Sequence, residues 1–169
     1  MRVEFRKVSP DDYQAICDLM PDQEELFLIY AQGKHPLTVK QVEALVKKRM
    51  EPTVMLVDGR VAGFVNFYGY RDKRSVFIGN VVVDASLRGR GFGKRLVGHM
   101  IDLAFHKYDL PRVKLHVYDR NLGALLFYNR LGFKPYNMKE KKDFKGRSVV
   151  MFSLALSRDA VDTALARTG

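Results

Sequence analysis

The sequence predicts an α/β fold, because strand-like and helix-like patterns of apolar residues alternate along the 169 residues of the chain. The clearest strand signal is a hairpin, in which two apolar runs flank Asp58-Gly59. The clearest helix signal follows a glycine-rich turn, Arg88 to Gly93. A chain of this length buries one sizeable core but hardly two. We therefore expect one domain over residues 1–156 and a polar tail over 157–169.

The N-terminal region is predicted to contain one strand and two helices. Residues 3–8 alternate enough for a strand. The segment from Ser9 to Asp12 then supplies an N-cap, a proline at the first helical position and early acidic residues, which predict a helix over 10–19. A second amphipathic helix is predicted over 38–50, and residues 22–36 show no clear pattern.

The middle of the chain is predicted to form three strands. Asp58-Gly59 tolerates the positive φ angles of a type I′ turn, so residues 53–57 and 61–70 are expected to pair antiparallel. A polar turn leads to a third run, 75–83, so apolar that both of its faces must be covered. This third strand is therefore predicted to be central.

The C-terminal half is predicted to contain two helices and two strands. After the glycine-rich turn, Leu96, Met100 and Leu103 recur at helical spacing, which indicates a long buried helix. The remaining elements are a strand over residues 112–118, a helix over 121–131 that ends at Gly132, and a strand over 148–156.

Composition argues against several classes of protein. No run approaches the ~20 apolar residues of a membrane helix, and the charged N-terminus does not resemble a signal for secretion. The single cysteine, Cys17, cannot form an internal disulfide, and the histidines lack the spacing of a metal site. We therefore expect a cytoplasmic protein that binds no metal and does not enter a membrane.

The net charge points to anionic partners without identifying them. A formal charge of +10 attracts nucleic acid, an anionic membrane surface and a phosphate-rich cofactor alike. The basic residues are scattered along the chain, and no DNA- or RNA-binding signature is present. A nucleic-acid-associated module therefore stays an alternative, but not the favoured one.

The turn from Arg88 to Lys94 is the strongest candidate for a binding site. A glycine-rich turn between a buried strand and a helix exposes N–H groups at the positive end of the helix dipole, which favours an anion. A dinucleotide fingerprint starting at Gly89 would need glycine at Lys94, and a P-loop ending in Gly93-Lys94 would need glycine at Arg88. Neither motif matches, and the basic flanks disfavour a connection without a ligand.

The turn has instead the pattern R-x-x-G-x-G, and it resembles the pyrophosphate-binding motif of the GNAT superfamily of N-acetyltransferases. A second motif, N-x5-F-Y-x3-G-F, begins at Asn121 and also resembles this family. The order of elements over residues 75–133 matches as well. Only the region before about Thr53 lacks a recognisable match, and there the family varies with its acceptor.

The resemblance implies a single-domain α/β fold with a mixed, mostly antiparallel sheet flanked by helices. The sheet would splay between the strands of Val81 and Leu115, with acetyl-CoA in the gap. By the same resemblance, the cofactor-binding residues would be Val81, Val82, Val83, Arg88, Gly89, Arg90, Gly91, Phe92, Gly93, Lys94, Asn121, Ala124, Phe127 and Tyr128. The implied reaction is direct transfer of an acetyl group from acetyl-CoA to a primary amine in a ternary complex.

Tyr128 is the candidate general acid. A phenol with an ordinary pKa near ~10 stays protonated until a thiolate develops beside it, and then donates its proton. The alternative is a core aromatic residue, because Ala124, Phe127 and Leu131 share its helical face.

The general base is not assigned by the sequence. Well-described members of the family carry a glutamate on the strand before the glycine-rich turn, whereas this chain has Asn80. An amide cannot take up a proton, yet an alkyl ammonium with a pKa of ~10.4 must lose one before it attacks. Asn80 is therefore kept as a catalytic-site candidate, and the base is expected to be a water chain or another carboxylate.

The acceptor site is expected in the variable N-terminal region. Its candidate residues are Glu24, Glu25, Phe27, Tyr30 and Tyr68. A solvated helix start and ordinary core aromatics explain the same residues equally well. The acceptor is expected to be a small-molecule or peptide amine. Its identity and the oligomeric state are left open. A non-catalytic acyl-CoA-binding protein is a further alternative function.

Overall fold

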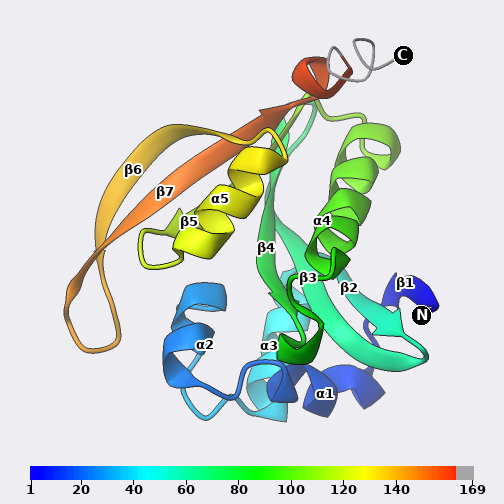
Figure 1. Cartoon of the computed structure of the whole chain (residues 1–169), viewed down its shortest axis with the longest axis vertical. Coiled ribbons are helices and arrows are strands. Elements are labelled where there is room, and N and C mark those ends of the chain that lie inside the picture. The colour runs from blue at the N-terminus through cyan, green and yellow to red at the C-terminus, as the bar shows by residue number, and fades with distance from the viewer. Residues whose placement is uncertain (163–169) are drawn as a thin grey trace. The chain divides into compact units, whose positions relative to one another are not determined.

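The computed structural model describes residues 1–162, and Figure 1 shows how its helices and strands follow one another. The strands are β1 (Val3–Lys7), β2 (Met50–Val57), β3 (Arg60–Arg71), β4 (Ser75–Val83), β5 (Arg112–Tyr118), β6 (Lys134–Lys142) and β7 (Ser148–Ser157). Hydrogen bonds connect them in the order β1-β2-β3-β4-β5-β7-β6. The β4–β5 pair is parallel, whereas the β1–β2, β2–β3, β5–β7 and β6–β7 pairs are antiparallel.

Helical elements lie between β1 and β2, between β4 and β5, and between β5 and β6. They are η1 (Pro10–Asp12), α1 (Tyr13–Asp18), α2 (Gln23–Ile29), α3 (Val39–Lys48), η2 (Ala85–Leu87), α4 (Phe92–Asp102), the π-helical turn η3 (Leu103–Lys107) and α5 (Leu122–Arg130). The predicted α/β class, with a mixed and mostly antiparallel sheet flanked by helices, is confirmed. None of the helices in the described chain has the length and the apolar content needed to span a membrane.

The chain packs as two compact units. Residues 1–68 and 79–99 form the first, and residues 69–78 with the described chain from residue 100 onward form the second. In the first unit, the predicted hairpin is present, because Asp58 (φ 48°) and Gly59 (φ 81°) both have the positive φ of a type I′ turn. Its core joins α1, α2, α3 and the strands through Ile16, Leu26 and Phe64, among others.

An ion pair between exposed Arg6 and buried Asp12 fixes the start of the helical layer in the first unit. Arg6 Nη1 lies 2.7 Å from Asp12 Oδ2, and Arg6 Nη2 lies 2.9 Å from Asp12 Oδ1. The hydrogen bond from Arg6 lowers the pKa of Asp12 below its ordinary value although burial opposes this. Ser9 N–H donates to the same carboxylate at 2.8 Å. The predicted N-terminal signal is thus present, although the first turn is 3-10 helical.

In the second unit, β7 pairs with β5 on one side and with β6 on the other. Val113, Leu115, Phe133, Leu154 and Leu156 are all buried in it. The residue pattern of this segment did not predict β6, and only the family resemblance placed a strand at Gly132-Phe133. β6 has the sequence KPYNMKEKK and is exposed over almost its whole length. Charged residues and proline are typical of an edge strand, where no second face imposes an apolar pattern. Residues 163–169 of the predicted tail lie outside the described residues.

Candidate functional site

The glycine-rich turn links β4 to α4 in the first unit. Gly89 (φ 73°) and Gly91 (φ 84°) both adopt the left-handed conformation, and α4 begins directly afterwards at Phe92. A Cβ atom added to either glycine would meet no atom within 4 Å. The backbone conformation, rather than lack of space, therefore requires glycine at both positions.

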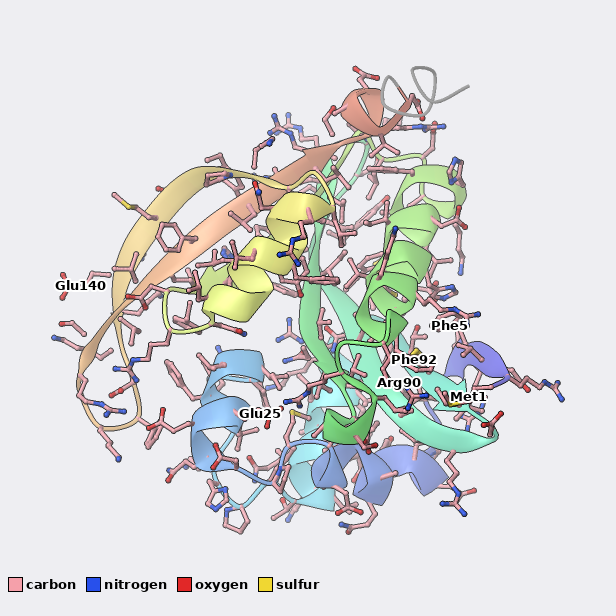
Figure 2. All side chains as sticks on the ribbon, in the orientation of Figure 1. Met1, Phe5, Glu25, Arg90, Phe92 and Glu140 are labelled. Carbon is pink, nitrogen blue, oxygen red and sulfur yellow. The ribbon has the colours of Figure 1, made fainter. Side chains whose placement is uncertain are left out.

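This turn has the groups that bind an anion. The first N–H groups of an α-helix have no carbonyl partner within the helix, and the positive end of its dipole lies there. Arg90, Lys94 and Arg95 are exposed around the beginning of α4. Figure 2 labels Arg90 in the turn and Phe92 at the first position of the helix. Phe92 itself is buried and anchors the helix start in the core.

Arg88, the first residue of the motif, uses its side chain within the protein. Its Nε donates to the Val83 carbonyl at 3.0 Å, and its guanidinium forms an ion pair with Glu25 of α2. The end of β4 and the helix α2 are thus both tied to the turn. Arg88 therefore holds the turn in shape, and Glu25 is already paired with a cation.

Asn80 lies in β4 with a positive φ of 54°, which is rare for a non-glycine residue in a strand. Its side chain is buried and continues a chain of amide hydrogen bonds. Asn66 Nδ2 donates to Asn80 Oδ1 at 2.8 Å, and Asn80 Nδ2 donates to the Ile29 carbonyl at 3.0 Å. The Asn80 side chain thus fixes the C-terminal end of α2. Val81, Val82 and Val83 follow it directly along β4.

The predicted acceptor residues all belong to the first unit. Glu24 is exposed in the first turn of α2, Phe27 is buried on the same helix, and Tyr30 ends it. Tyr68 is half-buried, and the Arg49 guanidinium lies 4.4 Å from its ring centroid. Within this set, Phe27 has the burial of a core residue, while Glu24 and Tyr68 reach solvent.

Asn66 is a residue of this region that the sequence analysis missed. Its side chain is fully buried, and its Oδ1 has no hydrogen-bond partner among the described residues. An added Cβ on Gly79 would lie 3.0 Å from this oxygen and 2.8 Å from the Tyr68 ring. An asparagine inside an apolar strand was the available signal, since buried amides usually have a structural or functional reason.

Tyr128 and Asn121 belong to the second unit. Asn121 caps α5, because its Oδ1 accepts a hydrogen bond from the Ala124 N–H at 3.3 Å. Tyr128 is only 7% exposed, and its ring lies 5.1 Å from that of Phe127 and 5.7 Å from that of Phe133 between centroids. Burial raises the pKa of Tyr128 above its ordinary value. The hydroxyl therefore stays protonated at neutral pH.

These features of the turn and of α5 agree with comparisons to known proteins. The sequence model of the Acetyltransferase (GNAT) family matches residues 13–133. The chain belongs to the GNAT family. It is an acyltransferase of this family, whose cosubstrate is acetyl-CoA. In the described chain, no group of three or more His, Cys, Asp or Glu residues is placed to hold a metal ion.

Individual GNAT proteins are similar over nearly the whole chain. The spermine/spermidine N(1)-acetyltransferase of Bacillus subtilis is 24% identical over 160 residues, which are 91% of this chain and 100% of that protein. A spermidine N-acetyltransferase from Vibrio cholerae, solved with CoA and spermine, aligns with a TM-score of 0.79 at 19% identity. That alignment covers 93% of this chain and 96% of the Vibrio chain.

A further solved structure shows the same fold. An acetyltransferase from Salmonella typhimurium, solved with its cofactor acetyl-CoA, aligns with a TM-score of 0.73 at 19% identity. The alignment covers 92% of this chain and 93% of that chain. The fold is therefore shared with these solved structures, while the acceptor is a separate question.

Proposed function

We propose that this GNAT protein transfers an acetyl group from acetyl-CoA directly to a primary amine. The observation that carries the proposal is the turn from Arg88 to Lys94, with two left-handed glycines before an 11-residue helix. Such a turn directs N–H groups and a helix dipole at a pyrophosphate. Family membership makes the pyrophosphate of acetyl-CoA the expected anion.

In the proposed reaction, the neutral amine nitrogen attacks the carbonyl carbon of the thioester. A tetrahedral oxyanion forms, the carbon–sulfur bond breaks, coenzyme A leaves as a thiolate, and the nitrogen releases its extra proton to water. Tyr128 donates its proton to that sulfur. Burial raises its pKa, so the phenol is protonated before the thiolate forms. The backbone of Val81 to Val83 is proposed to pair with the pantetheine arm. The Asn121 side chain is proposed to hydrogen-bond the same arm.

The side chains of Asn66 and Asn80 are buried amides, which cannot act as a general base. We therefore propose that no side chain at this position of β4 serves as the base. Asn80 positions α2 through the Ile29 carbonyl and has no basic site. Glu25 is held by Arg88, and Glu24 is exposed in the first turn of α2. We therefore assign proton removal from the acceptor to water, with Glu24 attracting the incoming ammonium.

The acceptor is proposed to be a small cationic amine. The N-cap of α2 is Asp22 and its first turn carries Glu24 and Glu25, in a chain with a net positive charge. Carboxylates attract and orient an ammonium. Similar proteins from Bacillus subtilis and Vibrio cholerae are named for spermine or spermidine, which are cationic amines. Spermidine is therefore the first acceptor to test.

The test is the release of free thiol from acetyl-CoA with a panel of amines. The panel contains spermidine, an amino acid and a lysine-containing peptide, and acetylated product is identified by mass. We expect thiol release with at least one amine, most rapidly with spermidine. Binding of acetyl-CoA without release of thiol in the presence of any amine would instead support the non-catalytic alternative.

Alanine at both Glu24 and Glu25 tests the acceptor assignment separately. We expect the KM for the amine to rise several-fold while the KM for acetyl-CoA changes little, since exposed carboxylates contribute ~0.2–1 kcal/mol each to such pairs. Lys40 and Glu43 on α3 provide a control, because the K40A/E43A variant alters exposed charges on a helix that carries no predicted site residue. An unchanged amine KM would remove α2 from the acceptor site.

A further inference from the structure

A second, basic cavity lies within the second unit. It has a volume of about 470 Å³ and is lined by the β3–β4 turn, the start of β5 and the end of β7. Its charged lining residues are Arg71, Lys73, Arg74, Arg112, Lys114 and Asp159. None of these residues belongs to the Arg88 to Lys94 turn. The cavity is therefore distinct from the anion site already described.

Strand pairing holds the charges of this cavity in place. The parallel register sets Val76 beside Val113 and Phe77 beside Lys114, which keeps the β3–β4 turn next to the start of β5. The antiparallel register sets Arg112 opposite Ser157. Arg74 N–H donates to the Arg71 carbonyl at 3.0 Å and closes the turn. The basic residues thus lie on strand ends and a tight turn. Little conformational entropy is therefore lost when an anion binds between them.

The charges in this cavity are not balanced. Five basic side chains line it with one carboxylate, Asp159. Between described residues, none of the five forms an ion pair with an acid, in contrast to Arg6, Arg88 and Arg158. Like charges at this density repel one another. A bound anion would replace that repulsion with attraction.

Lys114 shows the effect of this crowding. Burial lowers its pKa below the ordinary value, and the charges of Arg112 and Arg71 lower it further. Its Nζ lies 5.5 Å from the Phe77 ring centroid and 5.4 Å from that of Tyr136. The ammonium is thus held between two aromatic rings at the wall of the cavity, with no carboxylate partner among the described residues.

We propose that this cavity binds a small anion that carries at least two phosphate groups. Arginine side chains hold phosphate oxygens through paired N–H donors, and lysine adds a point charge. A cavity of about 470 Å³ lies in the range of small-ligand sites, which are ~300–1,000 Å³. This size favours a pyrophosphate-bearing small molecule over a nucleic-acid backbone, which would need an extended basic surface.

The proposal is tested by titrating the full chain with inorganic pyrophosphate and following backbone amides by NMR. Signals of Ser75, Lys114 and Ser157 report on the cavity, while those of Gly89 and Gly91 report on the turn. We expect both groups to move, with separate dissociation constants. Shifts confined to the turn would overturn the proposal, whether or not acetyl-CoA binds there.

Variants with altered charge provide a second test of anion binding at the cavity. The R71Q/R112Q variant changes exposed residues and should weaken binding at the cavity signals at least ~10-fold while leaving the turn signals unchanged, because two charge-assisted contacts are lost. The matched control is K134Q/K139Q, which removes the same charge from exposed positions of β6. Equal weakening in both variants would mean diffuse attraction to a basic surface and would contradict the assignment. Tighter binding of a single-stranded oligonucleotide than of pyrophosphate at the cavity would also contradict it.

Discussion

The glycine-rich turn and Tyr128 belong to the same family signature, but they depend on different physical properties. The turn is exposed, and its proposed ligand-binding groups are backbone N–H groups set by two positive φ angles. Tyr128 is buried among aromatic rings, and its proposed role rests on one hydroxyl. The turn is therefore sensitive to any residue that changes its backbone, and Tyr128 to the loss of a single oxygen.

This difference separates binding from turnover. Backbone donors act on the ground-state ligand and set its affinity. A general acid acts when charge develops on the leaving sulfur, and so it sets the rate of the chemical step. Substitutions in the turn and at Tyr128 are therefore expected to change different quantities, and substitutions at Asn80 and Glu25 to change the stability of the elements around the turn.

The largest expected effect comes from Tyr128→Phe. Removing the hydroxyl keeps the ring in its packing against Phe127 and Phe133 but removes the proposed proton donor. We expect kcat to fall about 100-fold or more, with the Kd for acetyl-CoA within ~2-fold of wild type. Steady-state thiol release measures the first quantity and calorimetry the second. Tyr136→Phe, at an exposed position of β6, is the control and should leave kcat unchanged.

The next effect comes from Gly91→Ala. The added methyl group meets no neighbour, so its cost is the left-handed backbone alone, about 1–2 kcal/mol. We expect the Kd for acetyl-CoA to rise about 5- to 30-fold. Gly98→Ala is the matched control, since this glycine lies in α4 with open space around it and without a positive φ. Gly98→Ala should leave the Kd unchanged and stabilise the protein by about 0.5–1 kcal/mol.

Asn80 combines a left-handed backbone with side-chain hydrogen bonds, so two substitutions are needed to separate these contributions to stability. Asn80→Gly permits the φ of 54° but removes the hydrogen bonds to Asn66 and Ile29. Asn80→Ala removes the same bonds and also strains the backbone. We expect a loss of about 1–3 kcal/mol in the free energy of unfolding for glycine, and a further ~1 kcal/mol for alanine. Urea unfolding gives both values, and equal losses would show that the left-handed backbone costs nothing here.

A small effect is expected from Glu25→Gln. The ion pair with Arg88 is partly exposed, with 26% of the Glu25 side chain accessible. Such pairs contribute ~0–1 kcal/mol. Thermal unfolding should therefore change only slightly, and the Kd for acetyl-CoA should stay within a few-fold. A larger loss of affinity would mean that Glu25, through Arg88, sets the shape of the turn.

The smallest effect is the response of kcat to alkaline pH. A general acid must be protonated, so its contribution is lost as the pH rises through its pKa. Burial raises the pKa of Tyr128 above 10.0, which moves this loss to higher pH. We expect kcat to show no decline up to about pH 10. A decline centred clearly below that pH would contradict Tyr128 as the acid.

Sequence patterns predicted the features that local rules determine. The hairpin at Asp58-Gly59, the apolar central strand and the turn at Arg88 all follow from short-range signals, and the structure contains each of them. The edge strand β6 was not predicted from its own residues, because an exposed strand has no apolar period.

The hydrogen bonds of the site were not predictable from sequence, because they join residues far apart in the chain. The Asn66 and Asn80 side chains meet across 14 residues, and Asn80 reaches Ile29 across 51. Arg88 meets Glu25 across 63 residues. The partners of a buried amide depend on which elements pack together, and no local spacing encodes that choice. Roles for Tyr128, Asn80 and the acceptor residues stay predictions.

The most direct test of the account measures the Kd for acetyl-CoA and the single-turnover rate at saturating acetyl-CoA in Gly91→Ala and Tyr128→Phe, side by side. We expect Gly91→Ala to weaken binding and keep the saturated rate, and Tyr128→Phe to keep binding and lose the rate. Loss of the same quantity in both variants, or a normal rate in Tyr128→Phe, would contradict the division between a turn that binds and a tyrosine that donates a proton.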